Sequence, residues 1–181
     1  MKVTSGKWKG RTILAPEWKL KPTSDKVRQA LFNMLRPISG IRFLDLFAGS
    51  GIVGITALSE GASFAAFVER DNTMFNTLRQ NLKNVGCSVQ EGIALRGNAL
   101  KAGSLFSGER FDVIFADPFY ADTPDILEIL YDQAKSLLAE NGVFVLEHGS
   151  NIPEDCLSKL SGLDSVKHYG DTMLSVYRRM K

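Results

Sequence analysis

Cysteine is scarce in this chain, which has only Cys87 and Cys156 in 181 residues. The two cysteines are far apart and do not follow the spacing of metal ligands, so we expect a reducing compartment and no bound metal. Long apolar segments are also missing. No run approaches the roughly 20 residues that a transmembrane helix requires, and the N-terminal residues lack the apolar stretch of a signal peptide. These absences predict a cytoplasmic protein that does not contact a membrane.

The residues that are present have the composition of an ordinary globular protein, with 44% hydrophobic and 23% charged residues. The sequence contains no internal repeat and no low-complexity segment. A chain of this length can bury an ample core within one domain. We therefore predict a single domain over residues 1–181 that acts as a monomer.

Positive charge is concentrated at the N-terminus. Residues 1–36 contain nine lysines and arginines but only two acidic residues, so this segment carries a charge of +7 and the remainder −5. Residues 2–18 are interpreted as a small hairpin with Gly6 and Gly10 as turn residues. Residues 1–22 then form either a nucleic-acid-binding arm, whose Trp8 and Trp18 stack on bases, or a solvated hairpin whose tryptophans pack on the domain. The charge asymmetry favours nucleic acid.

Predicted strands and helices alternate from residue 41 onward. The expected strands are 41–46, 64–69, 93–96, 111–116, 143–147, 166–169 and 173–178. The expected helices are one that is capped by residues 23–25 and runs to about residue 35, and then 50–60, 73–85, 123–138 and 154–161. This alternation predicts an α/β fold, in which a mostly parallel seven-stranded sheet has helices on both faces. The last two strands are predicted to pair as an antiparallel hairpin.

A glycine-rich loop follows the first strand, in Asp45-Leu-Phe-Ala-Gly49-Ser50-Gly51. Glycines let the backbone approach a ligand, and the following helix offers free N–H groups. The spacing also matches the dinucleotide fingerprint, which leaves an NAD-linked oxidoreductase as an alternative. A carboxylate at Asp45 would repel a pyrophosphate, however, and suits a ligand with an ammonium or sulfonium group. The loop therefore favours S-adenosylmethionine.

Two further polar residues lie at the ends of the next strands, since Glu69 ends the second strand and Asn98 follows the third. Glu69 can accept hydrogen bonds from two ribose hydroxyls, and Asn98 can bond an adenine edge, although asparagine is also a common turn residue. The predicted cofactor-binding residues are Asp45, Phe47, Gly49, Ser50, Gly51, Glu69, Arg70, Asn98, Ala99 and Asp117.

The stretch Asp117-Pro118-Phe119-Tyr120 follows a buried strand, where ligands collect in open α/β sheets. It resembles the (Asp/Asn)-Pro-Pro-(Tyr/Phe) motif of amino-methyltransferases, which methylate exocyclic nitrogens of adenine or guanine. Phe119 replaces the second proline, so the turn loses one fixed φ angle. The predicted catalytic residues are Asp117, Pro118, Phe119 and Tyr120.

The wider sequence resembles the RsmD family. The similar segments are Gly6-Lys-Trp-Lys-Gly-Arg11, residues 21–33, residues 45–51 and Tyr169-Gly-Asp-Thr172. The resemblance implies a Rossmann-like class I methyltransferase fold and S-adenosylmethionine as the methyl donor. It implies N2 of a guanine, position 966 of 16S ribosomal RNA, as the methyl acceptor, within the small ribosomal subunit or its assembly intermediate. It also implies that Asp117 and Tyr120 lie at the target base.

The residues that we predict to contact RNA are Lys7, Trp8, Lys9, Arg11, Lys21, Lys26 and Arg28. Lys21 and Lys26 stand where the family usually has arginine, and lysine cannot make the bidentate contact of arginine.

The expected mechanism uses the Asp117 carboxylate and the Pro118 carbonyl as acceptors for the exocyclic amine, with Tyr120 stacked on the base. His148 and His168 are expected to be structural or solvent-facing. A DNA adenine-N6 methyltransferase is an alternative, although such enzymes usually carry an insert for which this chain has no room. A non-catalytic RNA-binding module would need only the basic arm.

Overall fold

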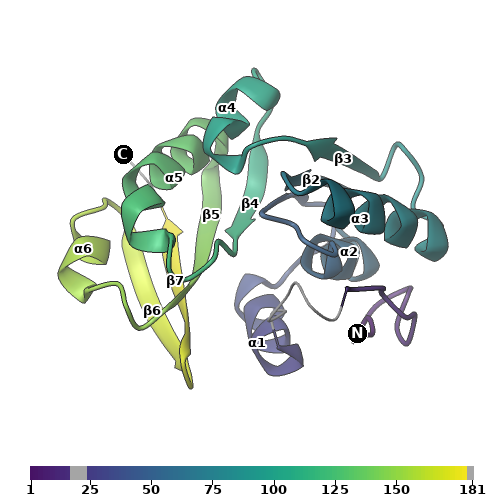
Figure 1. Cartoon of the computed structure of the whole chain (residues 1–181), viewed down its shortest axis with the longest axis horizontal. Coiled ribbons are helices and arrows are strands. Elements are labelled where there is room, and N and C mark those ends of the chain that lie inside the picture. The colour runs from purple at the N-terminus through teal and green to yellow at the C-terminus, as the bar shows by residue number, and fades with distance from the viewer. Residues whose placement is uncertain (17–23, 179–181) are drawn as a thin grey trace.

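A seven-stranded sheet organises the computed structural model, which describes residues 1–16 and 24–178 (Figure 1). The strand order is β3-β2-β1-β4-β5-β7-β6. The strands are β1 (Arg42–Leu46), β2 (Phe64–Glu69), β3 (Gly92–Arg96), β4 (Phe111–Ala116), β5 (Leu138–Gly149), β6 (Leu163–Tyr169) and β7 (Thr172–Arg178). Neighbouring strands among β1 to β5 are parallel, while β7 is antiparallel to both β5 and β6. The mostly parallel sheet with a C-terminal hairpin is thus confirmed.

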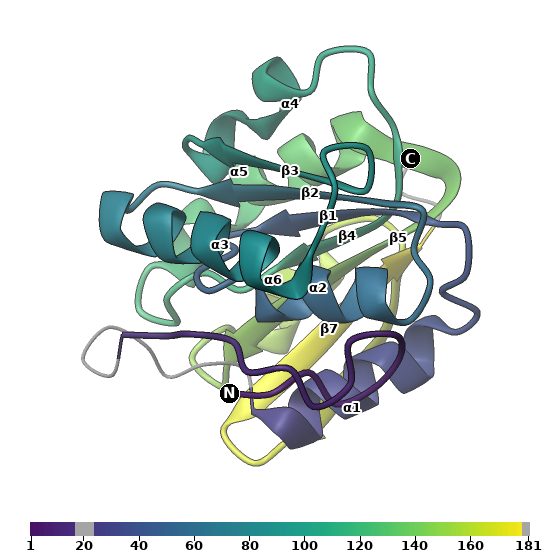
Figure 2. The same cartoon turned by 90° about the vertical axis from the view of Figure 1, so that its right-hand side faces the viewer.

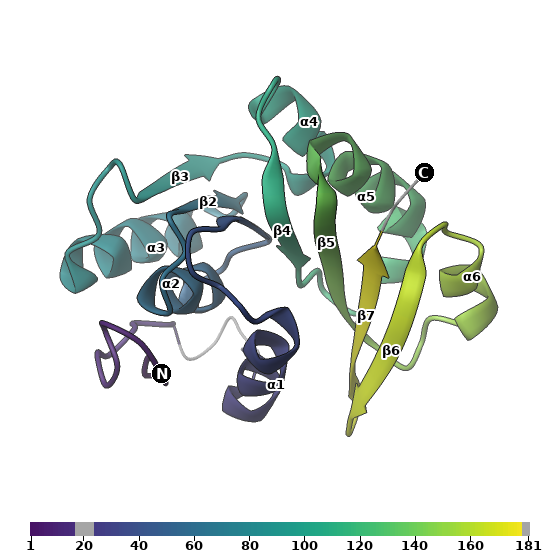
Figure 3. The ribbon, with the colours of Figure 1, turned by 180° about the vertical axis from the view of Figure 1, so that it is seen from behind.

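Helices cover both faces of the sheet, because successive strand residues point to opposite sides. Phe43 and Phe115 belong to the core beneath α1 (Asp25–Leu35), α2 (Ile52–Ser59) and α3 (Asn72–Val85). Leu44 follows Phe43 and Ile114 precedes Phe115, and both belong to the core beneath α5 (Thr123–Leu137) on the other face. The short α4 (Ala102–Leu105) and α6 (Glu154–Ser158) lie on the α5 side, as the view from behind shows (Figure 3).

Local signals placed most element boundaries correctly. Ser24 caps α1 by accepting from the Val27 N–H, and Gly86 ends α3 with φ of 77°. Helix α2 begins at Ile52, two residues later than predicted, because Gly51 adopts the left-handed conformation as its N-cap.

Four segments differ from the prediction more strongly. Helix α6 ends at Ser158 instead of residue 161. Strand β6 begins at Leu163 instead of Val166, because Leu163 already pairs with Tyr177 of β7.

Strand β5 starts at Leu138 instead of Val143, because Leu138 pairs with Phe111 of β4 although the polar residues that follow it resemble a loop. The 3₁₀ helix η1 (Ala99–Lys101) and α4 were not predicted, because such short elements show no helical periodicity.

The N-terminal hairpin is present within residues 1–16. The backbone of Val3 pairs with that of Gly10 and Arg11, and Lys2 pairs with Thr12. Gly6 lies so close to α2 that a Cβ there would be 1.8 Å from the carbonyl oxygen of Ser59. The segment runs along the α1–α3 side of the sheet (Figure 2). No helix within the described ranges is long and apolar enough to cross a membrane.

Candidate functional site

A cavity of about 940 Å³ opens at the carboxyl ends of the parallel strands. It lies beside β1, which has β2 on one side and β4 on the other, so it occupies the topological switch point of the sheet. The predicted residues that line it are Asp45, Phe47, Gly49, Ser50, Glu69, Arg70, Asn98, Ala99, Asp117, Pro118, Phe119 and Tyr120. Gly51 is absent from the lining. The fold therefore brings the glycine-rich loop and the Asp117–Tyr120 motif to one cavity.

Asp45 is almost entirely buried, with 2% of its surface exposed. Its Oδ2 accepts a hydrogen bond of 2.9 Å from the backbone N–H of Gly54 in α2. Burial raises the pKa of Asp45 to about 7; the Gly54 bond lowers it, and the nearby negative charge of Glu69 adds to the increase. Gly54 itself permits close helix packing, because a Cβ there would lie 2.3 Å from the ring of Phe67. Asp45 therefore has two roles: it holds α2 in position through Gly54, and it places a carboxyl group in the cavity.

Glu69 holds the glycine-rich loop. Its Oε2 accepts from the Gly49 N–H at 2.8 Å, and its Oε1 accepts from the Asp71 N–H at 2.7 Å. Each carboxylate oxygen can accept more than one hydrogen bond, so both retain capacity for ligand hydroxyls. The side chain is thus fixed in a geometry that a diol could use.

Asn98 combines the two roles that its sequence position suggested. Its Oδ1 accepts from the Leu100 N–H at 3.0 Å and caps η1, as a turn residue would. The residue also lines the cavity. With the oxygen engaged, the amide nitrogen is the group that can donate to a base edge.

The Asp117–Tyr120 segment forms the part of the cavity wall that follows β4. Asp117 is half-buried, Pro118 is buried and Phe119 has 69% of its surface exposed. The Phe119 carbonyl accepts from the Asp122 N–H at 2.9 Å, which ties this turn to the start of α5. The Tyr120 hydroxyl lies 2.8 Å from Thr172 Oγ1.

Sequence reasoning missed two buried residues of this wall, Glu147 and Thr172. Glu147 is the last residue of a predicted strand, and Thr172 ends the Tyr169–Thr172 motif, so both carried a usable signal. The neighbouring His148 is buried and shares hydrogen bonds with Gly149 O and Ser175 Oγ. Burial lowers its pKa, which agrees with a structural role.

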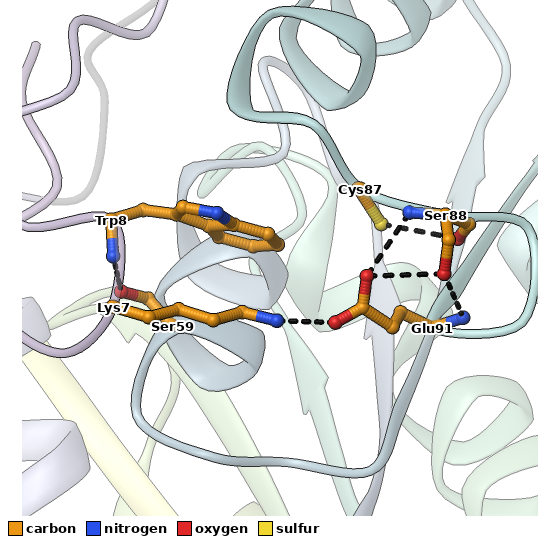
Figure 4. A network of polar contacts seen from close by, with 6 residues as sticks. All are labelled: Lys7, Trp8, Ser59, Cys87, Ser88 and Glu91. Carbon is orange, nitrogen blue, oxygen red and sulfur yellow. Dashed lines mark hydrogen bonds and ion pairs between the residues drawn. The ribbon is translucent and has the colours of Figure 1, made fainter.

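The Trp8 ring is buried and is not accessible for stacking on a nucleic-acid base. Only 8% of its surface is exposed, and its backbone N–H donates to Ser59 Oγ at 2.9 Å. Figure 4 shows Lys7 extended beside the Trp8 ring toward Glu91, with which it forms an ion pair. The Lys7 ammonium lies 4.3 Å from the ring centroid. The interpretation of Trp8 as a base-stacking residue is therefore wrong, because its ring packs in the core of the domain.

Arg28 was also assigned wrongly to the RNA surface. The side chain is fully buried, and its Nη2 donates to Lys2 O at 3.0 Å and to Asp25 Oδ1 at 2.8 Å. It therefore joins α1 to the N-terminal segment. Lys9, Arg11 and Lys26 are exposed, whereas Trp18 and Lys21 lie outside the described residues.

The basic turn, residues 7–11, lies away from the cavity. The Lys7 N–H donates to Ser59 O at the end of α2, and Arg11 Nη1 donates to Asn84 O near the end of α3. The cavity faces the opposite ends of these helices, so the length of α2, roughly 12 Å, separates the two. The buried Asn81 connects the N-terminal segment to the glycine-rich loop, because its Nδ2 donates to both Leu14 O and Ser50 O.

The chain is similar to known proteins along its length. The family described as "Conserved hypothetical protein 95" matches residues 1–178. The Bacillus subtilis protein YlbH is 35% identical over 186 aligned residues, which cover 99% of each chain. Ribosomal RNA small subunit methyltransferase D of Haemophilus influenzae is 37% identical over 145 residues, or 78% of this chain and 72% of that protein. A solved structure of a hypothetical protein from Thermus thermophilus has a TM-score of 0.83 and 29% identity, covering 98% of this chain and 99% of the other.

Proposed function

Because this chain belongs to the RsmD family of methyltransferases, we propose that it methylates the exocyclic N2 of a guanine, position 966, in small-subunit ribosomal RNA. The observation that carries the proposal is the single cavity shared by the glycine-rich loop and the Asp117–Tyr120 motif. The proposal places the reaction in the cytoplasm, where ribosomal subunits are assembled. Methyl incorporation into naked ribosomal RNA, small subunits and DNA, each assayed separately, tests it.

The cavity residues fit S-adenosylmethionine. A volume of about 940 Å³ is large enough for a ligand of this size. Glu69 is held where its oxygens can accept from ribose hydroxyls, Asn98 and Ala99 can bind the adenine, and Asp45 supplies negative charge for the cationic part. When bound, the cofactor supplies an electrophilic methyl group on sulfur.

The residues after β4 act on the base. The lone pair of an exocyclic amine is delocalised into the ring, so the amine is a weak nucleophile. The Asp117 carboxylate and the Pro118 carbonyl accept hydrogen bonds from the two N–H groups of the amine. These bonds draw the nitrogen toward tetrahedral geometry. Asp117 also stabilises the positive charge that develops on the nitrogen, which becomes neutral when one of its protons passes through Asp117 to solvent. Tyr120 stacks on the base, which must leave its helix or lie in an open loop. Rate acceleration then rests mainly on positioning.

Loss of the Glu69 carboxylate should weaken cofactor binding. We expect Glu69→Ala to cost about 1–3 kcal/mol of S-adenosylmethionine affinity in calorimetry, because the ribose hydroxyls and the Gly49 N–H would lose their acceptor. Glu140→Ala is the matched control, since Glu140 is exposed in β5 and outside the cavity lining. If Glu69→Ala and the parent bound S-adenosylmethionine with equal affinity, Glu69 would not be a cofactor-binding residue.

The distance between the basic turn and the cavity favours a polymeric substrate. Lys9 and Arg11 are exposed and lie at the far ends of α2 and α3. A substrate that reaches both this turn and the cavity must span several nucleotides, which a folded ribosomal RNA does.

Charge reversal in the basic turn should weaken RNA binding. We expect the double variant Lys9→Glu/Arg11→Glu to bind ribosomal RNA more weakly and to flatten the plot of log affinity against log salt by about one to two units. Cofactor affinity should not change. Lys159→Glu/Arg110→Glu, on exposed residues just after α6 and just before β4, is the control. Truncation is a poorer test, because it would remove Val3, Trp8 and Ile13 from the core. An unaltered salt slope would show that the turn is only structural.

A further inference from the structure

Tyr120 is held at its hydroxyl by the C-terminal part of the sheet. The hydroxyl lies 2.8 Å from Thr172 Oγ1 and donates to Glu147 Oε1 at 3.3 Å. Both partners are more than nine-tenths buried, with 8% of Thr172 and 3% of Glu147 exposed. Since hydrogen bonds made away from solvent are stronger and more directional, the end of the phenol ring is fixed in position.

The rest of the Tyr120 residue is fixed as well. Asn151 Nδ2 donates to the Tyr120 carbonyl at 2.6 Å. Gly149 packs on the ring, and a Cβ at that position would lie 2.7 Å from Tyr120 Cδ2. This contact leaves no room for any side chain at Gly149 unless the ring moves.

The antiparallel pairing of β7 explains how these groups meet. Gly149, the last residue of β5, is directly opposite Thr172, the first residue of β7. Because β7 runs against β5, its first residue lies at the edge where the parallel strands end, beside the cavity. The Tyr169–Thr172 motif thus brings a hydroxyl to the cavity wall that parallel strands alone would not supply.

We propose that Thr172, Glu147 and Gly149 are positioning residues that fix the Tyr120 ring as the stacking surface for the target base. The C-terminal hairpin is then part of the base-binding site. This inference rests on the proposed function, in which Tyr120 stacks on the base. A ring held before the base arrives loses little rotamer freedom on binding, and the amine is placed reproducibly for methyl transfer.

Removal of the Thr172 hydroxyl tests the inference. We expect Thr172→Val, which keeps the side-chain shape, to lower single-turnover methyl transfer by about tenfold. RNA binding should weaken as well, while the S-adenosylmethionine affinity and the melting temperature should stay close to those of the parent protein. Thr172→Ser, which restores a hydroxyl, should recover most of the rate. Thr77→Val is the matched control, because Thr77 is half-buried outside the cavity lining and its hydroxyl donates to the Thr73 carbonyl within α3.

A double-mutant cycle separates positioning from general structural support. Tyr120→Phe should lower transfer at least as much as Thr172→Val, because it removes the bond to Glu147 as well as the bond to Thr172. The double variant should be no worse than Tyr120→Phe alone, because the Thr172 bond is already lost in that variant. Gly149→Ala should lower transfer at least as much by displacing the ring. Full activity of Thr172→Val, or defects that multiply in the double variant, would overturn the inference. Failure of the parent protein to methylate any RNA would instead refute the proposed function, and the inference with it.

Discussion

Replacement of Asp117 with alanine should reduce methyl transfer by about 10²-fold or more, the scale for loss of one preorganised electrostatic group. Asp117 follows β4 and is half-buried in the cavity wall, so its removal leaves no hole in the core. The variant should therefore stay folded and still bind the cofactor. The loss should fall on the chemical step, because the carboxylate acts on the amine.

Single-turnover transfer of labelled methyl to small subunits that lack the modification measures this effect. Asp117→Asn is the finer comparison, because asparagine retains an acceptor oxygen and should keep partial activity. Asp132→Ala, at an exposed position in α5 outside the cavity lining, is the control. An Asp117→Ala protein that is as fast as the parent at equal cofactor occupancy would refute the mechanism and leave this motif as an ordinary turn.

Asp45 should make the cofactor-free protein less stable as the pH rises. Its folded-state pKa is about 7 against an ordinary value of 3.8, chiefly because of burial. Between these values the folded chain keeps a proton that the unfolded chain releases, so the free energy of unfolding falls as pH increases from about 4 to 7. Above pH 7 the cost of ionised Asp45 is on the order of 4 kcal/mol.

Asp45→Asn should remove this pH dependence, because the amide cannot ionise and its oxygen can still accept from the Gly54 N–H. We expect the variant to melt several degrees above the parent at pH 8 and to differ less at pH 4. The variant should also bind S-adenosylmethionine more weakly. Parallel melting curves of parent and variant from pH 4 to 8 would contradict the assignment.

Calorimetry provides an independent check on Asp45. A cationic ligand favours the ionised carboxylate, so the parent should release a proton when it binds S-adenosylmethionine below pH 7. Titrations in buffers of different ionisation enthalpy count that proton. The Asp45→Asn protein should release none through this group, and equal proton release in both proteins would place the ligand charge elsewhere.

The sequence by itself determined the elements whose signals are local. Apolar runs predicted strands at 64–69 and 111–116, which match β2 and β4. Ser24 and Gly86 marked the ends of two helices through capping interactions within a few residues. The cavity residues Asp45, Glu69 and Asn98 were also predictable, because each lies at or just after the carboxyl end of a strand, and parallel strands end at a common edge.

Only the tertiary structure decided which surface each polar or aromatic residue faces. Arg28 lies off the apolar stripe of its helix, yet the N-terminal segment covers it, and Trp8 packs in the core although it is flanked by lysines. Thr172 meets Tyr120 through the register of β7 against β5, across 52 residues of chain. Such contacts depend on strand order and on docking between distant segments. Short-range periodicity and capping carry no information about them, because their free energy arises only when the sheet is assembled.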